Sequence, residues 1–118
     1  MASRLEVHKL SGTSGDVVLV RLVDQKVIDS KIIQEIGVEL GALVDAGHTK
    51  MVIAFDNVQM LASPMLNALL RLREKVNSKA GALRLCNIAL PVRDVFIIPR
   101  LDKIFVIKDT EKEALADI

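Results

Sequence analysis

A continuously apolar segment between two helical patterns constrains the fold of this 118-residue chain more than any other feature. Residues 51–55 have the sequence Met-Val-Ile-Ala-Phe and carry no polar side chain. A strand without a polar face needs apolar cover on both sides, which is typical of parallel sheets in α/β proteins. We therefore expect residues 51–55 to form the middle strand of a mostly parallel sheet.

Two amphipathic helices are predicted on either side of this strand. Apolar residues recur at steps of three and four over residues 32–44 and again over residues 65–76, with charged residues between them. Asp29 is a suitable N-cap for the first helix, and Gly47 can end it in a left-handed conformation. These spacings place long helices directly before and after the central strand.

The remaining segments complete one α/β domain, which we assign to residues 1–118. Residues 4–10 alternate between polar and apolar, and a small-residue turn joins them to a β-branched run at 17–23, which predicts an antiparallel hairpin. Further strands are expected at 82–88 and 104–107. A short helix should begin at Pro91, and a capping box should open the last helix, with Thr110 bonded to Glu113. The whole pattern predicts a mostly parallel central sheet with an antiparallel N-terminal strand, right-handed crossovers and about four helices.

Composition argues against several classes of function. Lys plus Arg number 16 and Asp plus Glu 15, so the net charge is +1, and aromatic residues are only 3% of the chain. Neither a basic field nor stacking platforms for nucleic acid are expected. No apolar run approaches the roughly 18 residues of a membrane span. The single Cys86, with no secretory signal, indicates a reducing, cytoplasmic setting.

Catalytic and metal-binding groups are also not apparent. His8 and His48 are far apart and have no neighbouring nucleophile, so we expect neither catalysis nor a metal site. No glycine-rich phosphate loop is present, and we expect no cofactor. Asp24, Asp29 and Asp56 follow expected strands, but turn formation and capping account for them. The sequence therefore predicts that this protein is not an enzyme.

The order of several short segments resembles the STAS domain family, particularly the bacterial anti-sigma factor antagonists. The segment Phe-Asp-Asn-Val at 55–58 leads to Ser63 at the start of a Leu-rich helix. The closing segments at 83–88, 92–96 and 101–105 are similar to the last strands and helix of the family. The resemblance extends over nearly the whole chain.

That resemblance implies a non-enzymatic switch. An antagonist of this family binds an anti-sigma factor, usually a serine kinase, and so frees a sigma factor. Phosphorylation of a serine at the start of the second helix ends the partnership. The family motif Asp-Ser-Ser/Thr-Gly-Leu falls on residues 62–66, where Ala62, Pro64 and Met65 replace the acidic residue, the usual acceptor and the glycine. Ser63 is the remaining hydroxyl.

Two roles for Ser63 are open from the sequence. A phosphate there would meet free amides and the positive end of a helix dipole. A simple N-cap also explains a serine before Pro64, and we favour that role. With Pro64 at the usual acceptor position, the protein would then bind its partner constitutively.

A partner-binding surface is predicted around residues 58–67. Met60, Leu61 and Met65 are more apolar than a turn requires, although one of them, Leu61, should pack inward. Polar residues at four-residue steps would add a rim, and an acidic family position falls near Val27, beside Asp24. The predicted partner-binding residues are Met60, Ala62, Ser63, Pro64, Met65, Asn67, Arg71 and Asp24.

We expect a module that binds an anti-sigma factor or a switch-type serine kinase and regulates sigma-factor-dependent transcription. The alternative is an interaction subunit of another signalling or transport-linked assembly.

Overall fold

The middle of the fold is β4 (Lys50–Ala54), the third of five strands in one sheet. The computed structural model describes residues 4–12, 15–97, 100–116 and 118. The strand order is β1-β2-β4-β6-β7, with β1 antiparallel to β2 and all other neighbours parallel. The prediction of a central strand is confirmed. The other strands of this sheet are β1 (Leu5–Gly12), β2 (Gly15–Leu22), β6 (Ala82–Cys86) and β7 (Val106–Lys108).

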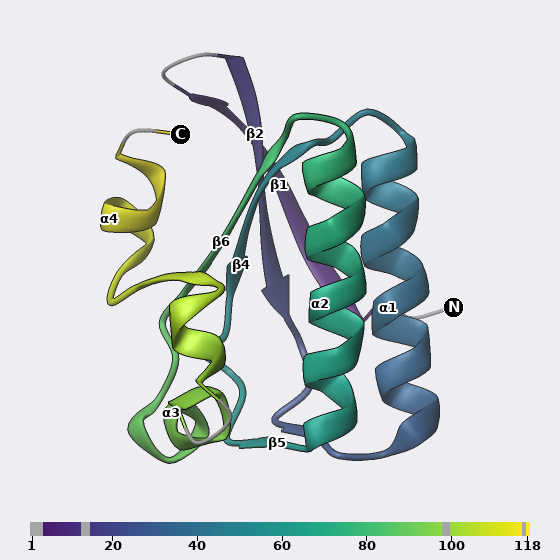
Figure 1. Ribbon diagram of the computed structural model, residues 1–118, viewed down its shortest axis with the longest axis vertical. Coiled ribbons are helices and arrows are strands. Elements are labelled where there is room, and N and C mark those ends of the chain that lie inside the picture. The colour runs from purple at the N-terminus through teal and green to yellow at the C-terminus, as the bar shows by residue number, and fades with distance from the viewer. Residues whose placement is uncertain (1–3, 13–14, 98–99, 117) are drawn as a thin grey trace.

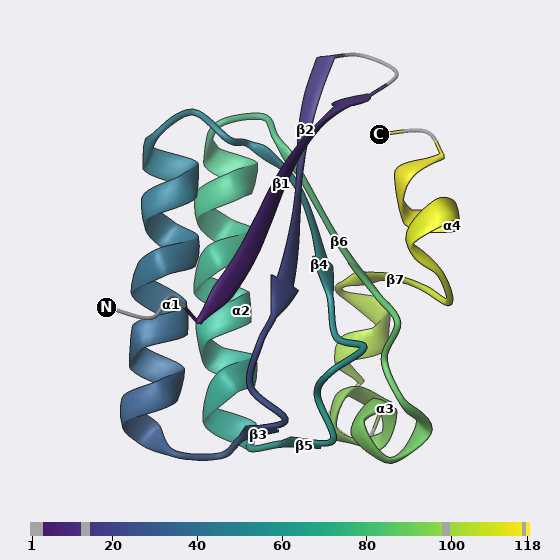
Figure 2. The ribbon, with the colours of Figure 1, turned by 180° about the vertical axis from the view of Figure 1, so that it is seen from behind.

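Helices cover the sheet unequally (Figures 1 and 2). The long helices α1 (Ser30–Asp45) and α2 (Ser63–Ser78) lie side by side on one face. The short helix α4 (Glu111–Leu115) lies on the other face. A fourth helix, α3 (Leu90–Ile97), lies near one end of the sheet and is followed by the 3-10 turn η1 (Leu101–Lys103).

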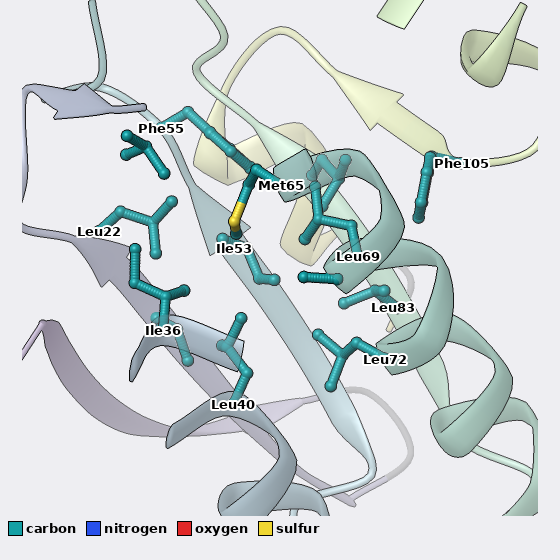
Figure 3. Close-up of a cluster of buried hydrophobic side chains, with 14 of the residues drawn as sticks. Leu22, Ile36, Leu40, Ile53, Phe55, Met65, Leu69, Leu72, Leu83 and Phe105 are labelled. Carbon is teal, nitrogen blue, oxygen red and sulfur yellow. The ribbon is translucent and has the colours of Figure 1, made fainter. Parts of the chain in front are cut away.

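The side chains of β4 divide between two apolar clusters. Met51 and Ile53 pack against the residues of α1 and α2, as Figure 3 shows for Ile53, whereas Val52 and Ala54 belong to a smaller cluster with α4. All four are fully buried. The alternation of a strand sends successive side chains to opposite faces, so an apolar β4 requires apolar cover on both.

The predicted caps of α1 and α4 are present. The Asp29 Oδ1 atom accepts from the Lys31 amide at 2.8 Å, and Thr110 Oγ1 accepts from the Glu113 amide at 3.2 Å. Gly47 follows the end of α1 with φ +102°, a conformation that glycine adopts without steric cost. Each cap satisfies amides or carbonyls that the helix itself leaves free.

Several strand boundaries differ from the prediction, and β6 ends at Cys86, not at residue 88. The ladder between β1 and β2 continues to Gly12 opposite Gly15, so most of the expected turn at 11–16 is strand. The last strand begins at Val106, not Ile104. Phe105 instead closes η1, because its amide donates to the Leu101 carbonyl, and its ring packs edge-on to Phe96 with centroids 6.2 Å apart.

The start of β6 makes a close approach that admits only glycine. A Cβ atom added to Gly81 would lie 2.0 Å from the Thr49 carbonyl oxygen, whereas one added to Gly37 in α1 would meet Ala68 Cβ at an ordinary 3.9 Å. We expect Gly81→Ala to lower the free energy of unfolding by roughly 2 to 4 kcal/mol, because backbone must move. Gly37→Ala should raise it by about 0.5 to 1 kcal/mol. Urea unfolding of both variants checks this, and equal effects would contradict it.

Candidate functional site

The segment that leads into α2 is held by a second, two-stranded sheet. Here β5 (Met60–Leu61) pairs in parallel with β3 (Lys26–Val27). The amides of Gln59 and Met60 donate to the Gln25 carbonyl at 2.7 and 3.2 Å, and the Ala62 amide donates to the Val27 carbonyl at 2.9 Å. The sequence analysis did not predict this pairing, because two-residue strands are too short to show the alternation of a strand.

This pairing changes the role of Ser63. The N-cap of α2 is Ala62, which is extended (φ −90°, ψ 150°) and makes no side-chain capping bond. Ser63 is therefore the first helical residue, with Pro64 beside it in the first turn, and the prediction that Ser63 caps the helix is wrong. The physical reason is the hydrogen bond from the Ala62 amide to the Val27 carbonyl, which holds Ala62 extended, while the Ala62 carbonyl accepts from the Met65 amide at 3.0 Å. The helix therefore starts one residue earlier than predicted.

Met65 is not on the surface, which corrects its assignment to the partner-binding set. Its side chain is fully buried and lies toward Ile53 and Leu69 of the core (Figure 3). Met65, Leu69 and Leu72 follow the three- and four-residue steps that keep one helix face inward. Leu61 is buried, as expected, whereas Met60 is 48% exposed.

The surface that remains combines exposed apolar residues with a polar line along α2. Ser63, Asn67 and Arg71 are exposed at four-residue steps. Ile28, which directly follows β3, is 48% exposed, like Met60 of the paired strand β5. The sequence analysis missed Ile28, although its position after the inward-facing Val27 is a signal of an outward side chain.

An open groove of about 650 Å³ adjoins this surface, between the start of α2 and the segment of α3 and η1. Its floor is mostly apolar, and Ser63 and Asn67 contribute the polar atoms of side chains. We call it the α2–α3 groove. It is lined by Leu61, Ala62, Ser63, Leu66, Asn67, Leu70, Val95 and Leu101.

Asp24 is engaged within the protein. Its Oδ1 atom accepts from Arg4 Nη1 at 2.9 Å, and Arg4 Nε donates to Glu35 of α1, also at 2.9 Å. The hydrogen bond to Glu35 is the main cause of the raised pKa of Arg4, with Asp24 adding to it. The structure thus ties Asp24 to α1, and a direct role in partner binding remains a proposal.

The other chemically reactive side chains are separate from this surface. Cys86 is fully buried, and burial raises the pKa of its thiol to about 12, with the nearby Glu111 carboxylate adding to the effect. Such a thiol is an unreactive small apolar group, as the sequence predicts.

Within residues 4–12, 15–97, 100–116 and 118, no three His, Cys, Asp or Glu side chains are arranged to hold a metal ion. No helix in that part of the chain is long and apolar enough to span a membrane.

The two methionines of this segment should respond differently to truncation. Met65→Ala would leave a cavity in the core and should lower the free energy of unfolding by roughly 2 to 5 kcal/mol. Met60→Ala is the matched control and should change it by less than about 1 kcal/mol. Chemical denaturation of both variants measures this. A larger loss for Met60→Ala would show that the two side chains had been assigned to the wrong environments.

Comparisons with known proteins agree on one fold. BtrV of Bordetella bronchiseptica, a candidate anti-sigma factor antagonist, is 28% identical over 92 residues, which cover 78% of this chain and 79% of BtrV. A STAS domain protein of Planctomyces limnophilus has a TM-score of 0.79 at 18% identity, with 93% of this chain and 95% of that one covered. The anti-sigma factor antagonist SpoIIAA, in its unphosphorylated form, has a TM-score of 0.74 at 21% identity, with 93% and 91% covered.

A family model extends this agreement from the fold to the sequence. The model for the STAS domain matches residues 10–114, which include both long helices, the central strand and the α2–α3 groove. The chain therefore belongs to the STAS domain family.

Proposed function

We propose that this protein acts in the manner of an anti-sigma factor antagonist: it binds an anti-sigma factor of the serine-kinase type and thereby regulates sigma-factor-dependent transcription in the cytoplasm. The names of BtrV and SpoIIAA support this class. The protein would act through its surface and carry out no covalent chemistry of its own.

The observation that carries the proposal is the presence of two exposed apolar side chains, Ile28 and Met60, at the β3–β5 pairing that leads into Ser63. Isolated apolar residues are common on protein surfaces, but Ile28 directly follows β3 and Met60 begins β5, and these two strands are hydrogen-bonded to each other. Removal of this apolar area from water stabilises a complex by about 25 cal/mol per Å². Asn67 and Arg71 would contribute a polar rim, as in most protein interfaces.

A phosphate on Ser63 would oppose this contact. The first turn of α2 has no acidic residue and no side-chain cap, so a phosphate on Ser63 would lie near the positive end of the helix dipole. Pro64 has no amide hydrogen and the Met65 amide donates to the Ala62 carbonyl, so the dipole and not a set of free amides would stabilise it. A dianion at Ser63 would place strong charge next to the apolar Met60, and desolvation of that charge would cost affinity. SpoIIAA has been solved in a phosphorylated form, which supports a switch of this kind.

Ala62 and Pro64 favour a second candidate function. Pro64 stands where the family motif usually carries its acceptor, and Ala62 replaces its acidic residue. The protein would then be a STAS interaction subunit of another signalling or transport-linked assembly, which binds without a phosphorylation step.

Phosphorylation distinguishes the two candidates. After incubation with a candidate switch-type serine kinase and ATP, mass spectrometry should find stoichiometric phosphate on Ser63. Ser63→Ala should abolish the label, whereas Ser78→Ala, at the exposed far end of α2, should retain it. No label, combined with kinase binding that survives Ser63→Ala, would favour the constitutive assembly subunit.

Binding measurements test the surface itself. Met60→Asp places a charge within the proposed contact and should weaken kinase binding by roughly 10- to 100-fold, about 1.4 to 2.8 kcal/mol. Val38→Asp is the matched control, because Val38 is an exposed apolar residue of α1 outside this surface. Calorimetric titration measures both. Unchanged affinity for Met60→Asp, or an equal loss for Val38→Asp, would exclude the proposed surface.

A further inference from the structure

Strand β1 is a long edge strand without a proline or a bulge, although it carries the charged side chains Glu6 and Lys9. It forms one end of the five-stranded sheet and pairs with β2 over eight consecutive residues without a bulge. It contains no proline, and two apolar side chains, Val7 and Leu10, are each more than a third exposed. Natural edge strands usually avoid this combination, because free amides and carbonyls of a flat edge recruit further strands.

The alternation of the ladder indicates which backbone groups face outward. In antiparallel pairs, every second residue exchanges hydrogen bonds with its partner. The Val23 amide donates to the Arg4 carbonyl at 3.1 Å, so the residues in phase with Arg4, such as Glu6 and His8, face β2. Val7 and Lys9 therefore direct their amides and carbonyls to the open side of the sheet.

The side chains of β1 are complementary to those of a second β1 when the twofold axis lies at Val7. A twofold axis perpendicular to the plane of the sheet leaves each face of the sheet on the same side in both copies. Two residues that lie opposite each other across the axis must therefore point to the same face. An axis at Val7 places Glu6 of each copy opposite His8 of the other, and this is a favourable cross-strand pair. An axis at His8 would instead place the two His8 side chains opposite each other, and an axis at Lys9 would do the same with the two Lys9 side chains.

We propose that two copies of this chain associate through β1, antiparallel and with the twofold axis at Val7, so that their sheets become continuous. A second copy is the occupant that the pattern favours, because the Glu6 and His8 positions complement themselves. The strand directions reverse across the axis. The two surfaces around Ser63 would therefore lie at opposite ends of the joined sheet, and each dimer could hold two partners.

Sedimentation equilibrium tests the association. The natural protein should sediment at twice its 12.9 kDa mass at high concentration. Val7→Lys would place two like charges at the axis and should raise the dimer dissociation constant at least tenfold, whereas Val38→Lys should leave it unchanged. Circular dichroism confirms that both variants are folded. A protein that stays monomeric at millimolar concentration, or a dimer that Val7→Lys does not weaken, would overturn the proposal.

Cross-linking tests the register. Two residues at position 7 would lie about 5.5 Å apart between Cα atoms, within reach of a disulfide, while two residues at position 8 would be separated by roughly 7 to 8 Å. With oxidised glutathione, Val7→Cys should form a covalent dimer much faster than His8→Cys. The buried Cys86 provides an unreactive background. Faster cross-linking by His8→Cys, or none by either variant, would overturn the register.

Exchanging the residues at positions 6 and 8 tests the contact between Glu6 and His8. Glu6→Lys alone should weaken dimerisation because it would face His8 of the second copy. The combined variant Glu6→His and His8→Glu restores the Glu–His pairs and should dimerise like the natural protein. A combined variant as weak as the single one would count against the Glu6–His8 contact.

Discussion

The burial of β4 between two apolar layers is the constraint on which the rest of the structure depends. Met51 and Ile53 require cover on one face and Val52 and Ala54 on the other, and each fully buried side chain of this kind contributes roughly 1 to 3 kcal/mol. The centre of the sheet therefore needs apolar cover on both of its faces. On the face opposite the long helices, Arg21 of β2 forms ion pairs with Asp56 and with Glu111 of α4, which helps to hold that short helix in place.

The small pairing of β3 with β5 decides what the protein presents at the start of α2. Because alternate residues of a strand face opposite sides, it directs Leu61 into the core and leaves Met60 outside. Its continuation through the Val27 carbonyl holds Ala62 extended, and the helix begins at Ser63. The exposed apolar Met60 and the exposed Ser63 thus follow from a few backbone hydrogen bonds outside the five-stranded sheet.

The two proposed contacts of the molecule use different parts of the fold. Partner binding would use the segment between β5 and α2, whereas self-association would use the outer edge of β1 around Val7. In the joined sheet, a partner bound near Ser63 of one copy would not compete with the Val7 contact. The two activities can therefore be altered independently, by Met60 in one case and by Val7 in the other.

The sequence by itself determined the order of the main elements, the central position of residues 51–55 and the caps at Asp29 and Thr110. These follow from local physical chemistry: the period of apolar residues, and side-chain oxygens that satisfy the amides of a helix end. Tertiary structure alone decided that Ala62, not Ser63, caps α2, and that Met65 is inside. Such features depend on hydrogen bonds and packing between segments far apart in the chain, such as that between Val27 and Ala62, which no local pattern contains.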